Sequence, residues 1–139
     1  MKFSNIEIVN MMNLLEKYSN SKLPQKIGYA ITRNLIMISK EYQVYETQLK
    51  KIFDTYDEYV IKDNEGNAVV NDFGIPTVKE EKSDEFYKEL TDLLNIKIDL
   101  NLYWIDEEVF NYDDAAGLYD ALPAKEILTL QSILCDPER

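Results

Sequence analysis

One stripe of apolar and aromatic side chains, spaced at the period of an α-helix, runs through the first half of this chain. Its members follow in steps of three or four residues: Ile27, Ile31, Leu35, Ile38, Tyr42, Tyr45, Leu49, Ile52, Tyr56 and Tyr59. The mean step of about 3.6 residues is the α-helical period, and no proline interrupts it. The stripe therefore predicts one helix over residues 24–59, with Pro24 in the first turn, where its missing N–H costs nothing.

A helix of this length needs something to cover its far half. At about 1.5 Å per residue it would run for about 50 Å, which is longer than one small domain requires, so we expect either a packing partner or a kink. The stripe turns tyrosine-rich after Ile38, and tyrosine can pack its ring while its hydroxyl stays in water. One interpretation is a self-association seam, and the other is a core stripe with phenols at its rim. The seam would consist of Tyr42, Tyr45, Leu49, Ile52 and Tyr56.

A first, shorter helix is predicted to begin at Ser4. Ser4 and Glu7 have the spacing of a capping box, and Phe3 with Ile8 could form the hydrophobic staple around it. The polar run at residues 19–21 should end this helix.

Residues 60–71 read as a β-hairpin, because β-branched residues flank a turn-forming run at 63–67. That run does not fit an EF-hand, which needs glycine at position six and glutamate at position twelve. Counted from Asp63, glycine stands at position four and Gly74 at position twelve. Residues 71–79 are expected to form a loop.

The remaining chain predicts a helix over 80–95, a strand over 96–105 and a final helix opened by Pro123. The strand is indicated by strict alternation of apolar and polar residues from Ile96 onward, and we expect it to pair with the 60–70 hairpin. The predicted fold class is α+β: a long central helix, two or three further helices and a small antiparallel sheet or hairpin. We expect one domain over 1–139, with a helical half at 1–59 and an acidic half at 60–139.

The charge of the chain is concentrated in its second half. Residues 63–139 carry 19 acidic and 6 basic side chains, whereas residues 1–62 carry 7 and 9, for a net charge of −11. Such a balance disfavours direct binding to nucleic acid, whose affinity comes largely from neutralised phosphates. It favours a partner with a basic surface, although an acidic, solvated surface without a partner would look the same.

The residue inventory disfavours an enzyme. The chain has no histidine, one cysteine (Cys135) and no glycine-rich phosphate loop, which excludes Ser-His-Asp and Cys-His catalysis and a zinc site. Carboxylates at Glu107, Glu108, Asp113 and Asp114 could ligate Mg²⁺ or Ca²⁺ or form a glycosidase pair, but their spacing matches no such motif. We therefore expect no catalytic residue, no cofactor and no metal.

Acidic and aromatic residues alternate over residues 103–120. Aromatic anchors supply burial and charges supply steering at interfaces, so this segment is the predicted partner-binding site. The same surface could imitate a nucleic-acid backbone, or it could simply be an acidic loop over the core. The predicted site consists of Glu107, Glu108, Phe110, Tyr112, Asp113, Asp114, Tyr119 and Asp120.

Nothing in the sequence predicts a membrane segment. There is no run of about 18 apolar residues, and residues 1–5 do not resemble a signal peptide. A single cysteine fits a reducing cytoplasm.

Three segments carry a resemblance to a known family. Residues 3–8 (F-S-N-I-E-I), 22–27 (K-L-P-Q-K-I) and 29–34 (Y-A-I-T-R-N) are similar to small proteins of tailed phages and prophages of Gram-positive hosts. The function of that family is not established, and it offers no catalytic or ligand residues to carry over. The resemblance implies a binding role in the host cytoplasm. The tyrosine-rich far half of the long helix and the Trp104 strand depart from the family pattern, so a shared fold would not guarantee shared partners.

These observations favour three hypotheses in order. The first is a phage protein that binds and inhibits or redirects a host defence or nucleic-acid-handling protein with a basic surface. The second is a virion structural or assembly protein that forms a homo-oligomer through the long helix. The third is a protein that sequesters a small ligand such as a nucleotide, which requires Lys22, Lys26, Arg33, Lys50 and Lys51 to converge, within one chain or across a dimer.

Overall fold

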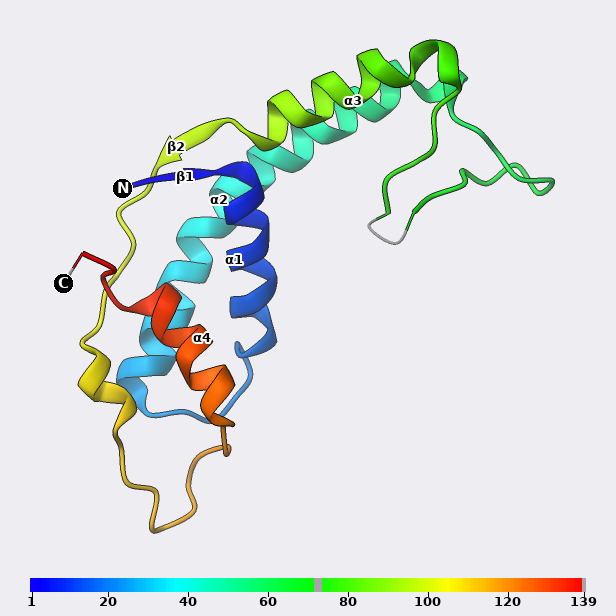
Figure 1. The fold of residues 1–139 in the computed structure, drawn as a ribbon. Helices are drawn as coiled ribbons and strands as arrows, with labels where there is room; N and C mark the ends of the chain where they lie inside the picture. The colour runs from blue at the N-terminus through cyan, green and yellow to red at the C-terminus, as the bar shows by residue number, and fades with distance from the viewer. Residues whose placement is uncertain (72–73, 139) are drawn as a thin grey trace.

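The computed structural model describes residues 1–71 and 74–138. Its axis is the long helix α2 (Gln25–Thr55), and α1 (Asn5–Lys17) lies along the first half of this axis (Figure 1). The helix α3 (Glu80–Leu94) runs beside the second half, and α4 (Ala124–Leu134) packs at the α1 end. With one small two-stranded sheet among the described residues, the α+β prediction is confirmed.

The start of α1 follows from its first four residues. The Ser4 hydroxyl accepts the Glu7 N–H at 3.3 Å, and the Glu7 carboxylate accepts the Ser4 N–H at 3.1 Å. This is the predicted capping box, which satisfies two backbone donors that a helix start would otherwise leave open. Phe3 and Ile8, the two staple residues, are both buried in the main core.

The long helix is slightly shorter than predicted. It ends at Thr55, and a 3₁₀ turn, η1 (Asp57–Tyr59), follows it. Two apolar clusters flank the helix. The main core joins α1, the first half of α2, α4 and residues 98–112, whereas a second cluster joins the far half of α2 to α3. The far half is therefore covered by a helix of the same chain.

The predicted pairing of the 96–105 strand is wrong. Only Lys97–Asp99 forms a strand, β2, and its partner is β1 (Lys2–Ser4) at the N-terminus, with Phe3 opposite Ile98. The Asn5 N–H continues the contact by donating to the Ile96 carbonyl at 3.0 Å, and the Asn5 side chain donates to the Leu93 carbonyl at the end of α3. The N-terminus thus satisfies backbone groups that the hairpin was expected to satisfy.

Residues 60–79 form an arm that projects from the tip of α2 and α3 (Figure 1). The predicted hairpin is present only as isolated bridges, with Lys62 opposite Ala68 around a turn in which Gly66 has φ +83°. The segment predicted as a loop adds a third arm segment, because Ile61 donates to Thr77, Thr77 to Val69, and Val69 to Ile61. Three backbone segments therefore close a ring of hydrogen bonds. The described arm excludes residues 72–73, which belong to the predicted loop.

Helices α3 and α4 agree with their predictions. Helix α3 begins at Glu80 and buries Phe86, Leu90 and Leu93, while Pro123 stands directly before α4, which buries Leu130 and Leu134. In the described part of the chain, no helix has both the length and the apolar character needed to cross a membrane.

Candidate functional site

The predicted partner-binding segment is built mainly as a loop over the core. A 3₁₀ turn, η2 (Glu107–Phe110), points the Phe110 side chain inward, where it is 6% exposed and part of the main core. Tyr112 and Tyr119 are half-buried and pack edge to face, with ring centroids 5.5 Å apart. Phe110 is thus not available as an anchor for a partner, which corrects that part of the prediction.

Two of the predicted carboxylates hold this loop in shape. Asp114 accepts the N–H groups of Leu118 at 2.7 Å and Tyr119 at 3.1 Å. Asp120 accepts the Lys22 N–H at 2.9 Å, and its own N–H donates to the Lys22 carbonyl at 2.7 Å. Of the eight predicted residues, Glu107, Glu108 and Asp113 remain as exposed acids whose side chains form no hydrogen bond or ion pair with the described residues.

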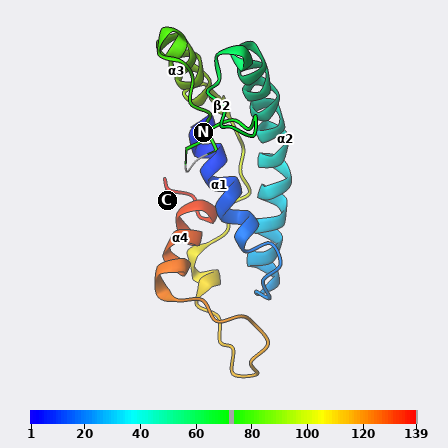
Figure 2. The same cartoon turned by 90° about the vertical axis from the view of Figure 1, so that its right-hand side faces the viewer.

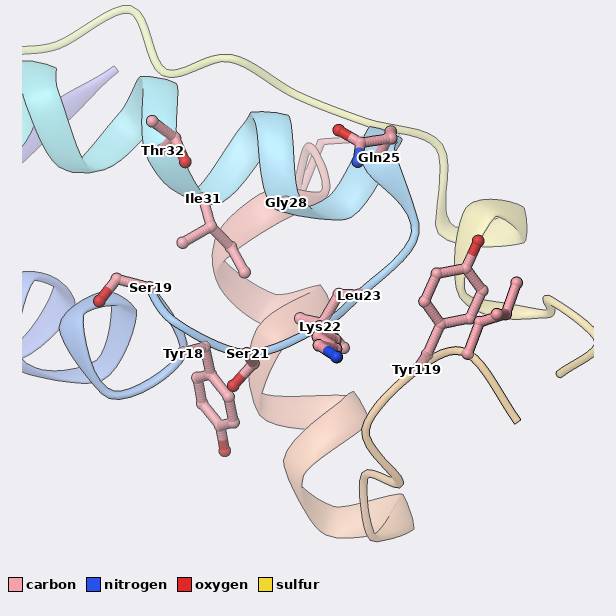
Figure 3. Close-up of a pocket in the computed structure, with 11 residues that line it drawn as sticks. Tyr18, Ser19, Ser21, Lys22, Leu23, Gln25, Gly28, Ile31, Thr32 and Tyr119 are labelled. Carbon is pink, nitrogen blue, oxygen red and sulfur yellow. The ribbon is translucent and has the colours of Figure 1, made fainter. Parts of the chain in front are cut away.

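A pocket of about 410 Å³ lies where this loop meets the turn between α1 and α2 (Figure 3). Tyr119 borders it from the loop, Tyr18 and Lys22 border it from the turn, and Ile31 and Thr32 border it from α2. Lys22 is the one charged residue in its lining. The cations proposed for a nucleotide site do not converge here, because Lys26 and Lys50 are separated by about 36 Å along α2 at its helical rise.

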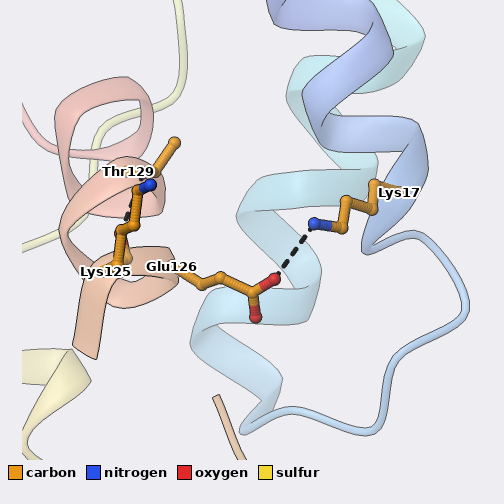
Figure 4. A network of polar contacts seen from close by, with 4 residues as sticks. All are labelled: Lys17, Lys125, Glu126 and Thr129. Carbon is orange, nitrogen blue, oxygen red and sulfur yellow. Dashed lines mark hydrogen bonds and ion pairs between the residues drawn. The ribbon is translucent and has the colours of Figure 1, made fainter. Parts of the chain in front are cut away.

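The last residue of α1, next to this turn, makes a polar contact with α4. The Lys17 ammonium lies 3.0 Å from a Glu126 carboxylate oxygen (Figure 4). A hydrogen bond from Lys17, with a further one from the Tyr18 hydroxyl, lowers the pKa of Glu126. Burial and the hydrogen bond between the Tyr18 hydroxyl and Glu126 raise the pKa of Tyr18. The contact links the end of α1 to the start of α4 and has no catalytic geometry.

The tyrosine stripe predicted as a seam faces the interior of the chain. Tyr45 is 9% exposed and Tyr56 is 7% exposed, while Tyr42, Leu49 and Ile52 are half-buried. The Tyr56 ring packs edge to face on Phe86 of α3 with centroids 5.4 Å apart. A hydrogen bond to the Glu89 carboxylate, with burial, raises the pKa of Tyr56 to about 12. Tyr45 and Tyr56 are therefore core residues of this fold, and a seam could use only the half-buried members.

An apolar hollow of about 590 Å³ lies between the two clusters. Ile6 and Val9 of α1, Leu49 and Phe53 of α2 and Leu94 of α3 contribute to its lining. Its polar side chains are two amides, Asn10 and Asn13, and the Tyr45 phenol. The hollow can supply burial, and the Tyr45 phenol is the ionisable side chain in its lining.

The solvent face of α3 carries a row of acids. Glu85 and Asp92 keep 63% and 68% of their side chains exposed, and each faces a lysine of the same helix at 3.6 Å. Such exposed ion pairs contribute little free energy and exchange readily for others. Glu81 and Glu89 are exposed on the same helix. Part of the acidic surface that the composition predicted thus lies on α3.

The outer face of α2 has the opposite charge. Its cations are Lys26, Arg33, Lys40, Lys50 and Lys51, and all five are exposed. Large apolar side chains stand among them, because Tyr29, Ile36 and Val44 are 52%, 58% and 59% exposed. In Figure 2 this helix forms the right-hand edge of the molecule, and α1 and α4 both lie on its other side. An acidic protein therefore presents one basic helix face with exposed apolar residues.

Arg33 is held in place on this face by two tyrosines. Its guanidinium lies 5.9 Å from the centre of the Tyr29 ring and 5.3 Å from that of Tyr103, and it donates to the Tyr29 hydroxyl at 2.9 Å. The two rings contact each other edge to face at 5.4 Å. Because both rings limit the rotamers of Arg33, less entropy is lost when its remaining donors bind an anion. Sequence analysis missed this cluster, since Tyr103 was expected in a strand beside the hairpin.

No group of three or more carboxylate or thiol side chains is arranged to hold a metal ion among residues 1–71 and 74–138. Comparisons with protein-family models, with curated proteins and with solved structures find no match to this chain.

Proposed function

We propose that this protein is a non-catalytic binding protein whose solvent face of α3 engages a basic surface of a protein partner. In the phage setting that the sequence resemblance implies, the partner is a host defence or nucleic-acid-handling protein in the host cytoplasm. The observation that carries the proposal is the row Glu81, Glu85 and Asp92, which lies on one helix and is exposed along its length.

The rigidity of α3 favours it over the predicted loop as the binding surface. The helix buries three large apolar side chains against α2, so its acids occupy defined positions. From Glu81 to Asp92 the row extends for about 16 Å at the helical rise. A fixed row of like charges steers a basic partner and selects against acidic ones. The loop over 106–120 has already committed Asp114 and Asp120 to its own backbone.

The test compares two variants of equal charge. The first carries Glu81→Lys, Glu85→Lys and Asp92→Lys on α3, and the control carries Glu107→Lys, Glu108→Lys and Asp113→Lys on the loop. Tagged wild-type protein and both variants are used to capture partners from host lysate at moderate salt, and the captured proteins are quantified by mass spectrometry.

The proposal predicts a stoichiometric protein partner that the wild type and the loop variant capture and the α3 variant loses. Raising the ionic strength should release the partner, because exposed charges are screened over about 8 Å at physiological salt. A partner retained by the α3 variant and lost by the loop variant would move the site to residues 107–113. Capture of no partner by the wild type would contradict the proposal.

A second candidate function is self-assembly through the long helix. The specific observation in its favour is the outer face of α2, where Tyr29, Ile36 and Val44 are exposed beside five cations. Exposed apolar residues within a charged rim are typical of protein interfaces. Sedimentation velocity over a range of protein concentrations tests this candidate, and a mass that stays at that of one chain would contradict it.

A further inference from the structure

We infer that the outer face of α2 on a second copy of this chain also fits the α3 row, so that the protein self-associates through α2 and α3. The inference rests on the proposed function, in which α3 is the binding surface, and it names a partner for that surface. Charge complementarity favours a second copy as the partner, because one chain carries both an exposed acidic helix face and an exposed basic helix face.

The cations of α2 point away from α3, so one chain cannot pair them with the α3 row. Leu49 and Tyr56 of α2 pack in the cluster with α3. Arg33 precedes Leu49, and Lys40 precedes Tyr56, by 16 residues. At about 100° per residue this separation places each cation about 160° around the helix from α3. Glu85 and Asp92 each stand one residue before a buried residue of α3, so they lie about 100° around α3 from its buried side.

The spacing of charges on the two faces is the same. Arg33 and Lys40 are seven residues apart on α2, and Glu85 and Asp92 are seven residues apart on α3. Both separations correspond to about 10.5 Å along a helix axis. Two helices lying side by side can therefore pair both cations with both carboxylates at once. The present partners of Glu85 and Asp92 are exposed lysines, Lys82 and Lys88, which can be exchanged at little cost.

The lengths and apolar groups of the two faces also agree. Helix α3 has 15 residues, which is about 22 Å, and the exposed apolar positions of α2 span the same distance from Tyr29 to Val44. The methylene stems of the α3 glutamates can cover Ile36 in such a contact. The Tyr29 and Tyr103 rings already orient Arg33, which lowers the entropic cost of its ion pair.

The charges decide which faces can meet. Packing α2 against α2 would bring cations onto cations, and packing α3 against α3 would bring carboxylates onto carboxylates. The complementary contact is α2 against α3, which uses a different surface on each copy. This contact can form twice about a two-fold axis, or once as a heterologous contact that closes into a ring or continues as a filament.

A charge-swap experiment tests the inference. One variant carries Arg33→Glu and Lys40→Glu on α2, and the other carries Glu85→Lys and Asp92→Lys on α3. Each variant alone presents like charges at the contact, whereas an equimolar mixture restores both complementary contacts. The average mass is measured by sedimentation velocity over a range of concentrations, with far-UV circular dichroism to verify folding.

The expected result is a wild-type mass that rises with concentration, two variants that each remain at the mass of one chain, and a mixture that associates again. The control variant Lys97→Glu, Lys125→Glu changes the charge equally outside the contact and should associate like the wild type. If either double variant fails to fold, Lys40→Glu and Asp92→Lys provide a milder pair that leaves the Arg33 cluster intact.

A wild type that remains monomeric at every concentration would overturn the inference, as would a mixture that does not associate. Neither result would touch the proposed function, which fails only if the α3 variant and the wild type capture the same partners from lysate or none. Conversely, an associating wild type with no other captured partner would leave self-assembly as the role of the α3 row. Association that survives in both double variants would place the contact elsewhere and overturn the inference.

Discussion

Asn34 and Tyr103 exchange two hydrogen bonds between α2 and the extended chain beside it. The Asn34 side chain donates to the Tyr103 carbonyl at 2.9 Å and accepts the Tyr103 N–H at 2.7 Å. One fully buried amide thus satisfies both backbone groups of a residue that has no strand partner. Because this contact fixes the Tyr103 backbone, it also determines where the Tyr103 ring meets Arg33.

Replacing Asn34 by alanine should destabilise the protein by about 2–3 kcal/mol, since two backbone groups lose their partner where water has little access. Urea denaturation measures the change, and Thr32→Ala, on the exposed side of the same helix, is the matched control. The Asn34→Ala variant should also self-associate less than the wild type, because Tyr103 no longer restrains Arg33. A loss below about 0.5 kcal/mol would mean that the two hydrogen bonds contribute little.

Replacing Tyr45 by aspartate should unfold the chain or destabilise it by about 3 kcal/mol or more, because an unpaired charge would enter the interior at a position that is 9% exposed. Thermal denaturation followed by circular dichroism measures the effect, and Val44→Asp on the exposed face is the control. A fully folded Tyr45→Asp variant that has only lost self-association would instead support the tyrosine stripe as a seam between copies.

The stability of the fold should decrease at alkaline pH, and Tyr56 should account for part of the decrease. Its pKa is about 12 in the folded protein and about 10.0 for a free tyrosine side chain. Above pH 10 the unfolded chain therefore loses this proton first, and the Tyr56 contribution is lost as the pH rises from 10 to 12. The variant Tyr56→Phe should show a shallower decrease in unfolding free energy over this range. Equal slopes for wild type and Tyr56→Phe would contradict the assignment.

Because Glu126 contacts Lys17, its ionisation should change the stability of the fold at acidic pH. The pKa of Glu126 lies below its ordinary value of 4.5 because the carboxylate accepts hydrogen bonds from Lys17 and Tyr18. Its contribution to stability is therefore present above pH 4.5 and is lost as the pH falls through the folded pKa. The variant Glu126→Gln should flatten this part of the stability curve, whereas Glu138→Gln in the exposed tail should leave it unchanged. Urea denaturation at several pH values distinguishes the two results.

The single cysteine should react slowly. Burial, with the nearby charges of Glu107 and Asp106, raises the pKa of the Cys135 thiol above its ordinary value. Because the thiolate is the reactive form, alkylation by iodoacetamide at pH 8 should be slower than that of free cysteine. The variant Glu107→Gln should speed the reaction and Glu108→Gln should do so less. A rate equal to that of free cysteine would show that the thiol is exposed and unperturbed.

The sequence by itself determined the elements whose cause is local. The 3.6-residue stripe, the Ser4–Glu7 capping box and the prolines before α2 and α4 act over a few residues, so the helices could be predicted within a few residues of their ends. The acidic character of one surface could also be predicted, because charge composition does not depend on the fold. Neither the apolar stripe nor the charge composition indicated which segment or molecule it would contact.

Only the tertiary structure decided which faces meet. Phe3 lies opposite Ile98, although nothing in the alternation of residues 96–103 distinguishes the N-terminus from the hairpin as a strand partner. The stripe on α2 became core because α3 folds back on it, and Phe110 was drawn inward by the same gain from apolar burial. Burial depends on which distant segments pack together, and this choice also left Arg33 of α2 and Asp92 of α3 exposed.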